Sequence, residues 1–274
     1  MTLSVAWVRK IGSIEELVVA SDSRLSGGES WDGNPKILLL PRTDAVIAFA
    51  GLTHSAYPLM LQAINAINNH QPAVNRVMDL TDLKGHLVRV FNHSRSFISD
   101  LPFGQYQPDL PGSQFLLAGY SSKEKRFRIW NLHFQKGTNE FTFAPIRMWR
   151  GQDGGSLKLV RFIGDFDAVT EAKRRLVEML VARNKIETGS LNMEPFEILV
   201  ELIRENRFSS VGGPPQMVKV YDHSNAAPVG VYWPDKASGQ VCMFGRPLMK
   251  YEKTSWGVMD PDKPTRAYPS NGGN

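Results

Sequence analysis

The sequence predicts an α+β domain in which groups of strands alternate with pairs of helices. Four short apolar runs, at 5–8, 17–20, 36–38 and 46–50, are separated by clusters of Gly, Ser, Asn and Pro. Such runs are typical of consecutive buried strands. Two helical patterns follow, and the same order of strands and then two helices returns after residue 115. A chain that alternates in this way favours helices packed on antiparallel sheets.

The first predicted helix covers residues 53–70, with Thr53 or Ser55 as its cap and Pro58 in its first turn. Its apolar stripe consists of Met60, Ala63, Ile64 and Ile67. A second, more polar helix is predicted over 79–99. The segment 101–113 then mixes proline and glycine with aromatic residues, which indicates a surface loop.

Three strands, at 115–119, 127–132 and 141–149, have the turn signals of a β-meander. The segment 159–166 is predicted to be a strand that leads into a helix capped by Asp165 or Asp167. Another helix begins near Asn192, and strands are predicted at 216–221 and within 229–247. We therefore expect one domain over residues 2–247. Residues 248–274 are polar and rich in Pro and Gly, so we expect a tail that is partly disordered or in contact with a ring.

The composition favours a soluble, cytoplasmic protein. Of the 274 residues, 42% are apolar, which suffices for a large core. No apolar run approaches the about 18 to 20 residues of a membrane span, and no leader precedes Thr2. We therefore expect no membrane partner. The single cysteine, Cys242, fits a reducing compartment and is expected to be a small buried residue.

The net charge of +5 raises the question of a nucleic-acid partner. The densest basic cluster, 173–175, lies within a predicted helix between Ala172 and Leu176, as expected of a solvated helix face. We therefore predict no nucleic-acid binding. The six histidines show no metal-ligand spacing, and the glycines at 151–155 lack the lysine and helix of a phosphate loop. We expect no metal and no cofactor.

Polar residues at predicted strand ends are the candidate catalytic groups. Thr2 precedes the first strand, Asp22 follows the second, Lys36 begins the third and Gly51 closes the fourth. If Met1 is removed, which a small second residue favours, the Thr2 hydroxyl and a free α-amino group belong to one residue. A nucleophile and its base would then lie side by side.

At Thr2, at residues 20–24, at Lys36 and at Ala50–Gly51, the chain resembles the proteasome β-subunit family and its simpler bacterial relatives. These are N-terminal-nucleophile (Ntn) hydrolases with threonine as the nucleophile. The resemblance spans roughly residues 2 to 222. It implies a four-layer αββα sandwich, with two antiparallel sheets flanked by helix pairs.

The resemblance also implies a role for each candidate. Thr2 would attack the carbonyl of the substrate, with its own amine as the base. Lys36 would lower the pKa of both groups, and Asp22 would keep Lys36 charged. The N–H of Gly51 would bind the developing oxyanion.

A peptide substrate would lie extended between residues 26–28 and 51–53, as a strand added to an edge. The residues expected to bind it, including the walls of the main specificity pocket, are Leu25, Ser26, Gly28, Phe49 and Thr53. These walls favour a small or medium apolar side chain.

The chain departs from the family pattern at two places. Gly164-Asp165-Phe166 stands where relatives have a Gly-Ser-Gly turn, so an acid replaces a serine. Where relatives have an aspartate and a serine after the fourth helix, this chain has Ser209 and Ser210. A carboxylate at Asp165 would tend to raise the pKa of the Thr2 amine.

We therefore expect a threonine-type peptidase or amide hydrolase that forms an acyl-enzyme ester, within a homo-oligomeric ring. Its substrate would be a peptide or an unfolded protein, and an ATPase could supply it. Two alternatives stay open. One is a catalytically silent ring subunit, favoured by the missing aspartate and the long C-terminal extension. The other is a small-molecule amidase that uses the same threonine.

Overall fold

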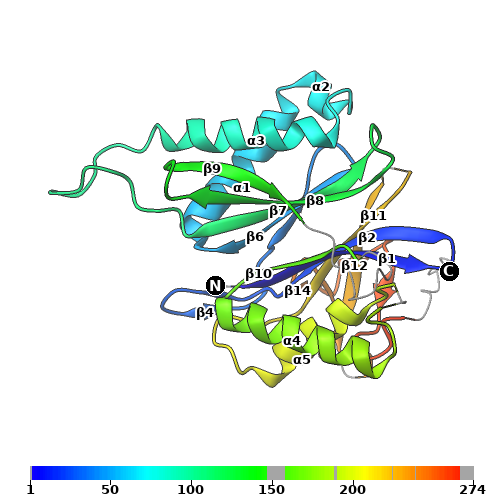
Figure 1. Cartoon of the computed structure of the whole chain (residues 1–274). Helices are drawn as coiled ribbons and strands as arrows, with labels where there is room; N and C mark the ends of the chain where they lie inside the picture. The colour runs from blue at the N-terminus through cyan, green and yellow to red at the C-terminus, as the bar shows by residue number, and fades with distance from the viewer. Residues whose placement is uncertain (1, 147–157, 188–189, 224, 238, 266–274) are drawn as a thin grey trace.

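The computed structural model describes residues 2–146, 158–187, 190–223, 225–237 and 239–265. Within these residues the fold is mixed α/β, with several antiparallel sheets and five helices, which confirms the predicted mixture of strands and helices. Figure 1 shows two large sheets near the centre, with helices on their outer sides.

The larger sheet has eight strands and contains both β1 and β2. Its order is β10 (Val160–Gly164), β1 (Leu3–Ile11), β2 (Ile14–Ser21), β11 (Gln216–Tyr221), β12 (Ala226–Trp233), β13 (Gln240–Met243) and β14 (Arg246–Pro247), with β15 (Val258–Met259) paired in parallel to β12.

The second sheet has five antiparallel strands. A separate two-stranded hairpin lies between β2 and this sheet along the chain. The order is β5 (Ile37–Leu39), β6 (Ala45–Gly51), β7 (Ser113–Ser121), β8 (Arg126–Gln135) and β9 (Glu140–Pro145); the hairpin is β3 (Leu25–Ser26) with β4 (Ser30–Trp31).

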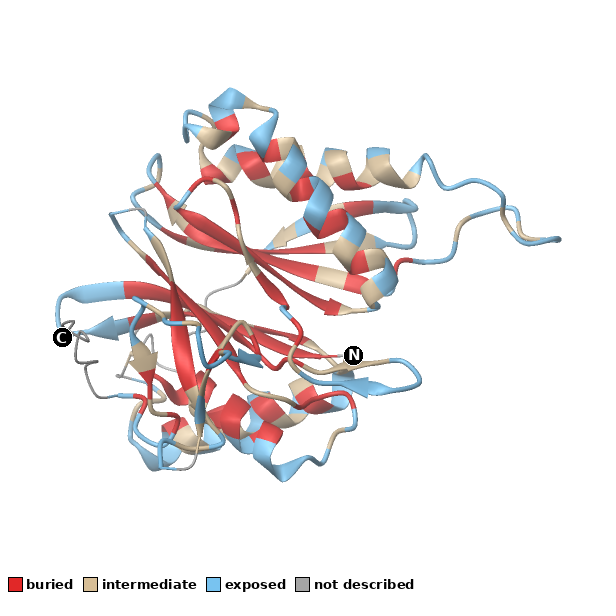
Figure 2. Ribbon diagram, turned by 180° about the vertical axis from the view of Figure 1, so that it is seen from behind, coloured by how far each residue is buried: buried red, intermediate tan, exposed pale blue. Residues whose placement is uncertain are grey.

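Three apolar clusters hold these elements together, and Figure 2 shows buried residues throughout both sheets. One lies between the larger sheet and helices α4 (Phe166–Ala182) and α5 (Glu194–Glu205). A second lies between the five-stranded sheet and α1 (Thr53–Asn68), α2 (Gln71–Val74) and α3 (Leu80–Arg95). The third lies between the two sheets and includes Val19 from β2 and Ala48 from β6. Strand alternation explains this division, because successive side chains point to opposite faces.

The helix boundaries agree with the predictions to within a few residues. The pattern over 79–99 forms α3 up to Arg95, and the short α2 was not predicted. Of the two candidate caps for α4, Asp165 is the N-cap, since its side chain accepts from the N–H groups of Asp167 and Ala168. The cap predicted for α1 is wrong, because its N-cap position is Leu52.

Two predicted segments lie partly outside the described residues. The strand predicted at 141–149 is β9, which ends at Pro145, while residues 147–149 lie outside the described residues. In the predicted tail, the described part reaches Thr265 and packs on the domain, because β15 pairs with β12 and Met259 is fully buried. Residues 266–274 lie outside the described part of the chain.

The predicted surface loop connects α3 to β7 and extends far from the body, at the left of Figure 1. Its tip exposes two aromatic side chains, Phe103 and Tyr106, which are 110% and 95% exposed. A turn in which the N–H of Gln105 donates to the carbonyl of Pro102 shapes this tip.

The basic cluster in α4 is largely neutralised on the surface. Arg174 forms ion pairs with Glu171 and Glu178, and Arg175 forms ion pairs with Glu171 and Glu205. None of the helices in the described part of the chain is long and apolar enough to cross a bilayer.

The substitution Phe91→Ala tests the core between the five-stranded sheet and its helices. Phe91 is fully buried, and its ring lies against those of Phe115 and Phe141. Removing it should lower the free energy of unfolding by about 3–5 kcal/mol in chemical denaturation. The matched control is Leu61→Ala on α1, where the side chain is 57% exposed. A loss at Phe91 no larger than that of the control would contradict this packing.

Candidate active site

Three of the predicted residues meet at one end of the two sheets. Thr2 directly precedes β1, Asp22 directly follows β2 and Lys36 directly precedes β5. The Nζ of Lys36 donates to Thr2 Oγ1 at 2.6 Å and to the two carboxylate oxygens of Asp22 at 2.9 and 3.0 Å. Thr2 is 1% exposed and the other two are fully buried. The structure therefore places a hydroxyl, an amine and a carboxylate in one buried cluster.

Asp22 is held by backbone donors as well as by Lys36. Its Oδ1 accepts from the N–H of Leu3 at 3.0 Å, and its Oδ2 accepts from the N–H groups of Arg24 and Gly212, each at 3.1 Å. These donors come from β1, from the segment after β2 and from the segment before β11. A buried carboxylate requires this number of donors to compensate for its lost hydration.

The environment of Lys36 lowers its pKa. Burial is the largest cause, since it penalises the ammonium form. The charge and the hydrogen bond of Asp22 act in the opposite direction and offset part of this effect. Lys36 is therefore easier to deprotonate than an exposed lysine, while it stays within hydrogen-bond distance of the Thr2 hydroxyl.

Gln216, the first residue of β11, holds the backbone around this cluster. Its Oε1 accepts from the N–H groups of Lys36 and Ile37, at 2.9 and 3.2 Å. Its Nε2 donates to the carbonyls of Asp22 and Asn34, both at 3.0 Å. The amide thus ties the segments that carry Asp22 and Lys36 to each other. Sequence reasoning missed Gln216, because its role depends on which segments become neighbours of β11.

The turn between β10 and α4 fixes the backbone of Thr2. The N–H of Asp165 donates to the carbonyl of Thr2 at 2.8 Å. Gly164 approaches so closely that a Cβ there would lie 1.8 Å from the same carbonyl oxygen, and its φ is +143°. Only glycine fits this position.

Asp165 and Ser210, noted above as departures from the family pattern, lie together. The hydroxyl of Ser210 donates to Asp165 Oδ2 at 3.1 Å, while Oδ1 caps α4. The acid and the hydroxyl are therefore both present near Thr2, with the acid before α4 and the hydroxyl after α5.

Gly51 closes β6 and has a φ of +112°. A Cβ there would lie 1.9 Å from the carbonyl oxygen of Gly112, so packing against the start of β7 by itself requires glycine. Strand β6 also contacts the N-terminal strand, because the hydroxyl of Ser4 donates to the carbonyl of Phe49 at 3.2 Å. The oxyanion role of Gly51 stays a prediction.

The five predicted substrate-binding residues occupy two segments. Leu25 and Ser26 form β3, Gly28 lies in the turn of this hairpin with a φ of +117°, and Thr53 begins α1. Phe49 is fully buried beneath α1, with its ring 5.1 Å from that of Tyr57. Phe49 is thus a core residue, and the predicted pocket role of these side chains stays a prediction.

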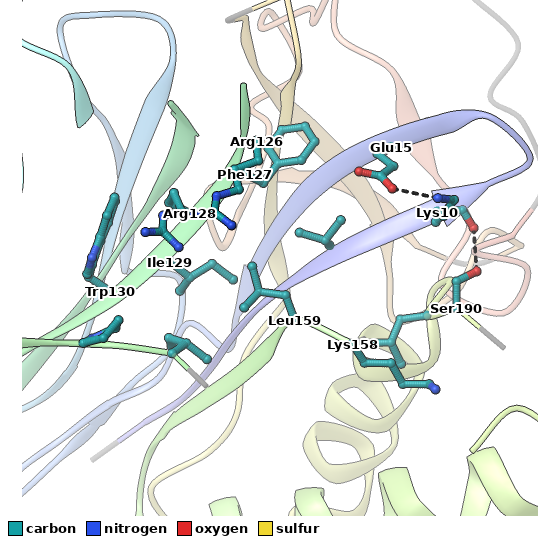
Figure 3. A pocket seen from close by; sticks show the side chains of 14 residues that line it. Lys10, Glu15, Arg126, Phe127, Arg128, Ile129, Trp130, Lys158, Leu159 and Ser190 are labelled. Atoms are coloured by element: carbon teal, nitrogen blue, oxygen red, sulfur yellow. Dashed lines mark hydrogen bonds and ion pairs between the residues drawn. The ribbon is translucent and has the colours of Figure 1, made fainter. Parts of the chain in front are cut away.

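A cavity of about 300 Å³, shown in Figure 3, lies toward the other end of β1. Lys10 and Glu15 line it and form an ion pair, and the hydroxyl of Ser190 donates to the Lys10 carbonyl. It shares no lining residue with the Thr2 cluster. Among the described residues, no group of three or more His, Cys, Asp or Glu side chains could hold a metal ion.

This geometry can activate a hydroxyl. A threonine hydroxyl is a weak nucleophile until a neighbouring base takes its proton or a cation stabilises the alkoxide. Lys36 is in contact with that oxygen and can act in either way, while Asp22 fixes its Nζ. A buried ion pair is a weak source of stability, so its presence here favours a chemical explanation.

The substitution Gly164→Ala tests the contact with the Thr2 carbonyl. A methyl group there must displace Thr2, so we expect a loss of at least about 1–3 kcal/mol in the free energy of unfolding. The matched control is Gly137→Ala, because a Cβ at Gly137 meets open space. Equal stability of the two variants would show that Thr2 is not held in this way.

The substitution Lys36→Met tests the buried ion pair. It leaves the carboxylate of Asp22 without its cation, so we expect a loss of about 3–5 kcal/mol. The control is Lys10→Met, which breaks the exposed pair with Glu15 and should cost about 1 kcal/mol or less.

The pH dependence of the Lys36→Met effect tests the lowered pKa of Lys36. Between that lowered pKa and the ordinary value of 10.5, the unfolded chain binds more protons at this residue than the folded chain. The contribution of Lys36 to stability therefore rises with pH in this window. Denaturant titrations should give a wild-type advantage over Lys36→Met that grows up to pH 10.5. An advantage that shrinks would contradict the lowered pKa.

No model of a protein family matches this chain, and no curated protein matches it significantly. What can be said of its function therefore rests on the residues and the geometry described above.

Proposed function

We propose that this chain is an Ntn hydrolase that cleaves peptide or other amide bonds, with Thr2 as the nucleophile and with the four-layer αββα sandwich of that class. The observation that carries the proposal is the contact of Lys36 Nζ with both Thr2 Oγ1 and Asp22 in a buried cluster. Three clusters of apolar residues, one between the sheets and one beneath each helix group, support the layered arrangement.

Removal of Met1 would begin the mechanism, because it frees the α-amino group of Thr2. An unperturbed α-amino group has a pKa of about 7.7–8.0, so a large fraction is neutral near pH 8. The amine takes the proton of the Thr2 hydroxyl while the oxygen attacks the carbonyl carbon of the substrate. Lys36 stabilises the negative charge on Thr2 Oγ1, and the Gly51 N–H binds the oxyanion.

The tetrahedral intermediate then collapses. The C–N bond breaks, the protonated α-amine gives its proton to the leaving amine, and an ester with Thr2 remains. Water, deprotonated by the same amine, attacks the ester, and the carboxylic acid product leaves with Thr2 restored.

Asp165 is compatible with this mechanism because its carboxylate is engaged elsewhere. It accepts from two N–H groups at the start of α4 and from the hydroxyl of Ser210. A carboxylate bound at a helix N-terminus has its charge partly compensated there. Its tendency to raise the pKa of the Thr2 amine is therefore reduced.

The proposed substrate is an extended peptide or an unfolded protein. The two-residue strand β3 begins three residues after Asp22. Among the described residues it pairs only with β4, so its other edge is one to which a peptide could add as a strand. The homo-oligomeric ring and the ATPase partner are parts of this proposal that follow from the resemblance, and the cytoplasmic location stays the expectation drawn from the composition.

Intact-mass spectrometry with a peptide epoxyketone tests the nucleophile. This probe forms a stable ring only with an N-terminal residue that has both a hydroxyl and a free amine. We expect a protein without Met1 that gains the mass of one probe molecule. Thr2→Ala should abolish the adduct, while Thr2→Ser and the exposed control Thr138→Ala should keep it.

The other outcomes separate the alternatives. Retained Met1 would leave the Thr2 nitrogen in a peptide bond and would favour the silent ring subunit. A trimmed chain that gains no probe and hydrolyses small amides as a monomer or dimer, by mass photometry, would favour the amidase.

A further inference from the structure

A cavity of about 450 Å³ lies beside that of Figure 3, with which it shares Pro145 and Ile146. Its walls come from β8, β9, β10 and α4, where the edge strands of the two sheets meet. We call it the edge cavity. Its size falls within the range of about 300–1,000 Å³ that is usual for small-molecule sites.

Two buried polar atoms at the edge cavity have no hydrogen-bond partner: the Oδ1 of Asn131 and the Nε of Arg161. Asn131 is 7% exposed. Both residues lie on the strand faces that point between the sheets, since Ile129 and Ile163, two positions away on β8 and β10, belong to the cluster between the sheets. A buried polar group without a hydrogen-bond partner is unfavourable, so two of them in one cavity require an explanation.

The described residues that line the cavity carry positive charge. Arg161 and Lys173 line it, and no acidic residue is among the lining residues that the structure describes. Within the described residues, neither Arg161 nor Lys173 forms an ion pair. In contrast, Arg174 and Arg175, which follow Lys173 on α4, are each paired with glutamates. The pKa of Lys173 is lowered by burial and, to a smaller extent, by the charge of Arg161. The two cations therefore line the same cavity, and neither has an acidic lining residue beside it among the described residues.

We propose that the edge cavity binds a small organic anion, a carboxylate or a phosphate monoester on an apolar body. The guanidinium of Arg161 and the ammonium of Lys173 would bind the anionic group. The Oδ1 of Asn131 would accept from an O–H or N–H of the same ligand. Pro145, Leu176 and Val177 would contact the apolar body. The proposal does not depend on the function proposed for Thr2.

The neighbouring basic side chains do not offer the same chemistry. Arg126 and Arg128, which line the cavity of Figure 3, both form ion pairs with Glu124. An anion there would have to compete with a carboxylate already in place. This difference assigns the ligand to the edge cavity.

Isothermal titration calorimetry of the full chain tests the proposal with phenyl phosphate, 3-phenyllactate and inorganic phosphate. We expect saturable binding of at least one of the two aromatic anions, and weaker binding of inorganic phosphate, which lacks the apolar body. Phenyl phosphate against phenyllactate shows which anionic group the site prefers. The same binding is expected in Thr2→Ala, which separates this site from the proposed catalytic one.

Variants locate the binding. Arg161→Met should weaken it about tenfold or more, since a charge-assisted hydrogen bond contributes more than one power of ten. Lys173→Met should weaken it several-fold, and Arg174→Met should leave it unchanged. Without ligand, Arg161→Met should keep or raise the thermal midpoint, because it removes an unpaired donor.

Three results would overturn the proposal. One is the absence of saturable binding for all three probes. The second is binding that Arg161→Met and Lys173→Met both leave unchanged. The third is binding that inorganic phosphate matches in affinity. If Arg161→Met fails to fold, the exposed position Lys173 carries the test alone.

Discussion

The carboxylate of Asp22 is the group on which the buried cluster around Thr2 depends. It accepts from the backbone on β1, after β2 and before β11, and it binds the side chain of Lys36 at the start of β5. One carboxylate thus accepts from Leu3 and from Gly212, which lie more than 200 residues apart in the sequence. Because such a pair is a poor source of stability once desolvation is counted, its value lies in fixing Lys36 Nζ against Thr2.

The surrounding polar and glycine residues make this arrangement rigid. Gln216 ties the backbones that carry Asp22 and Lys36, and Gly164 lets β10 approach the carbonyl of Thr2. Each of these contacts is made to backbone atoms. Thr2 and Lys36 are therefore positioned by the sheets, which give the rigid support that a reactive group would need.

Much of this could be predicted from the sequence. Apolar periodicity located most helices and strands, and the ordered polar residues at strand ends pointed to Thr2, Asp22 and Lys36, which the structure brings together. Gln216, Gly212 and the Asp165–Ser210 contact were out of reach, because they depend on which strands become neighbours, and periodicity does not encode pairing. The short strand β15 was missed for the same reason: it is stabilised by β12, not by its own two residues.

The hydrogen bond that holds the Thr2 backbone has a consequence for the order of events during synthesis. Once β1 has paired with β10, the Thr2 carbonyl accepts from the N–H of Asp165 at 2.8 Å, and the backbone at Thr2 is fixed. An aminopeptidase must bind an extended chain end. On the proposed function, Met1 therefore has to be removed before β10 pairs with β1. The ribosome adds the 148 residues between these strands, 12–159, in about 7–30 s at about 5–20 residues per second. On the proposed function, removal of Met1 by a processing enzyme at the ribosome would then have to be faster than the pairing of β1 with β10.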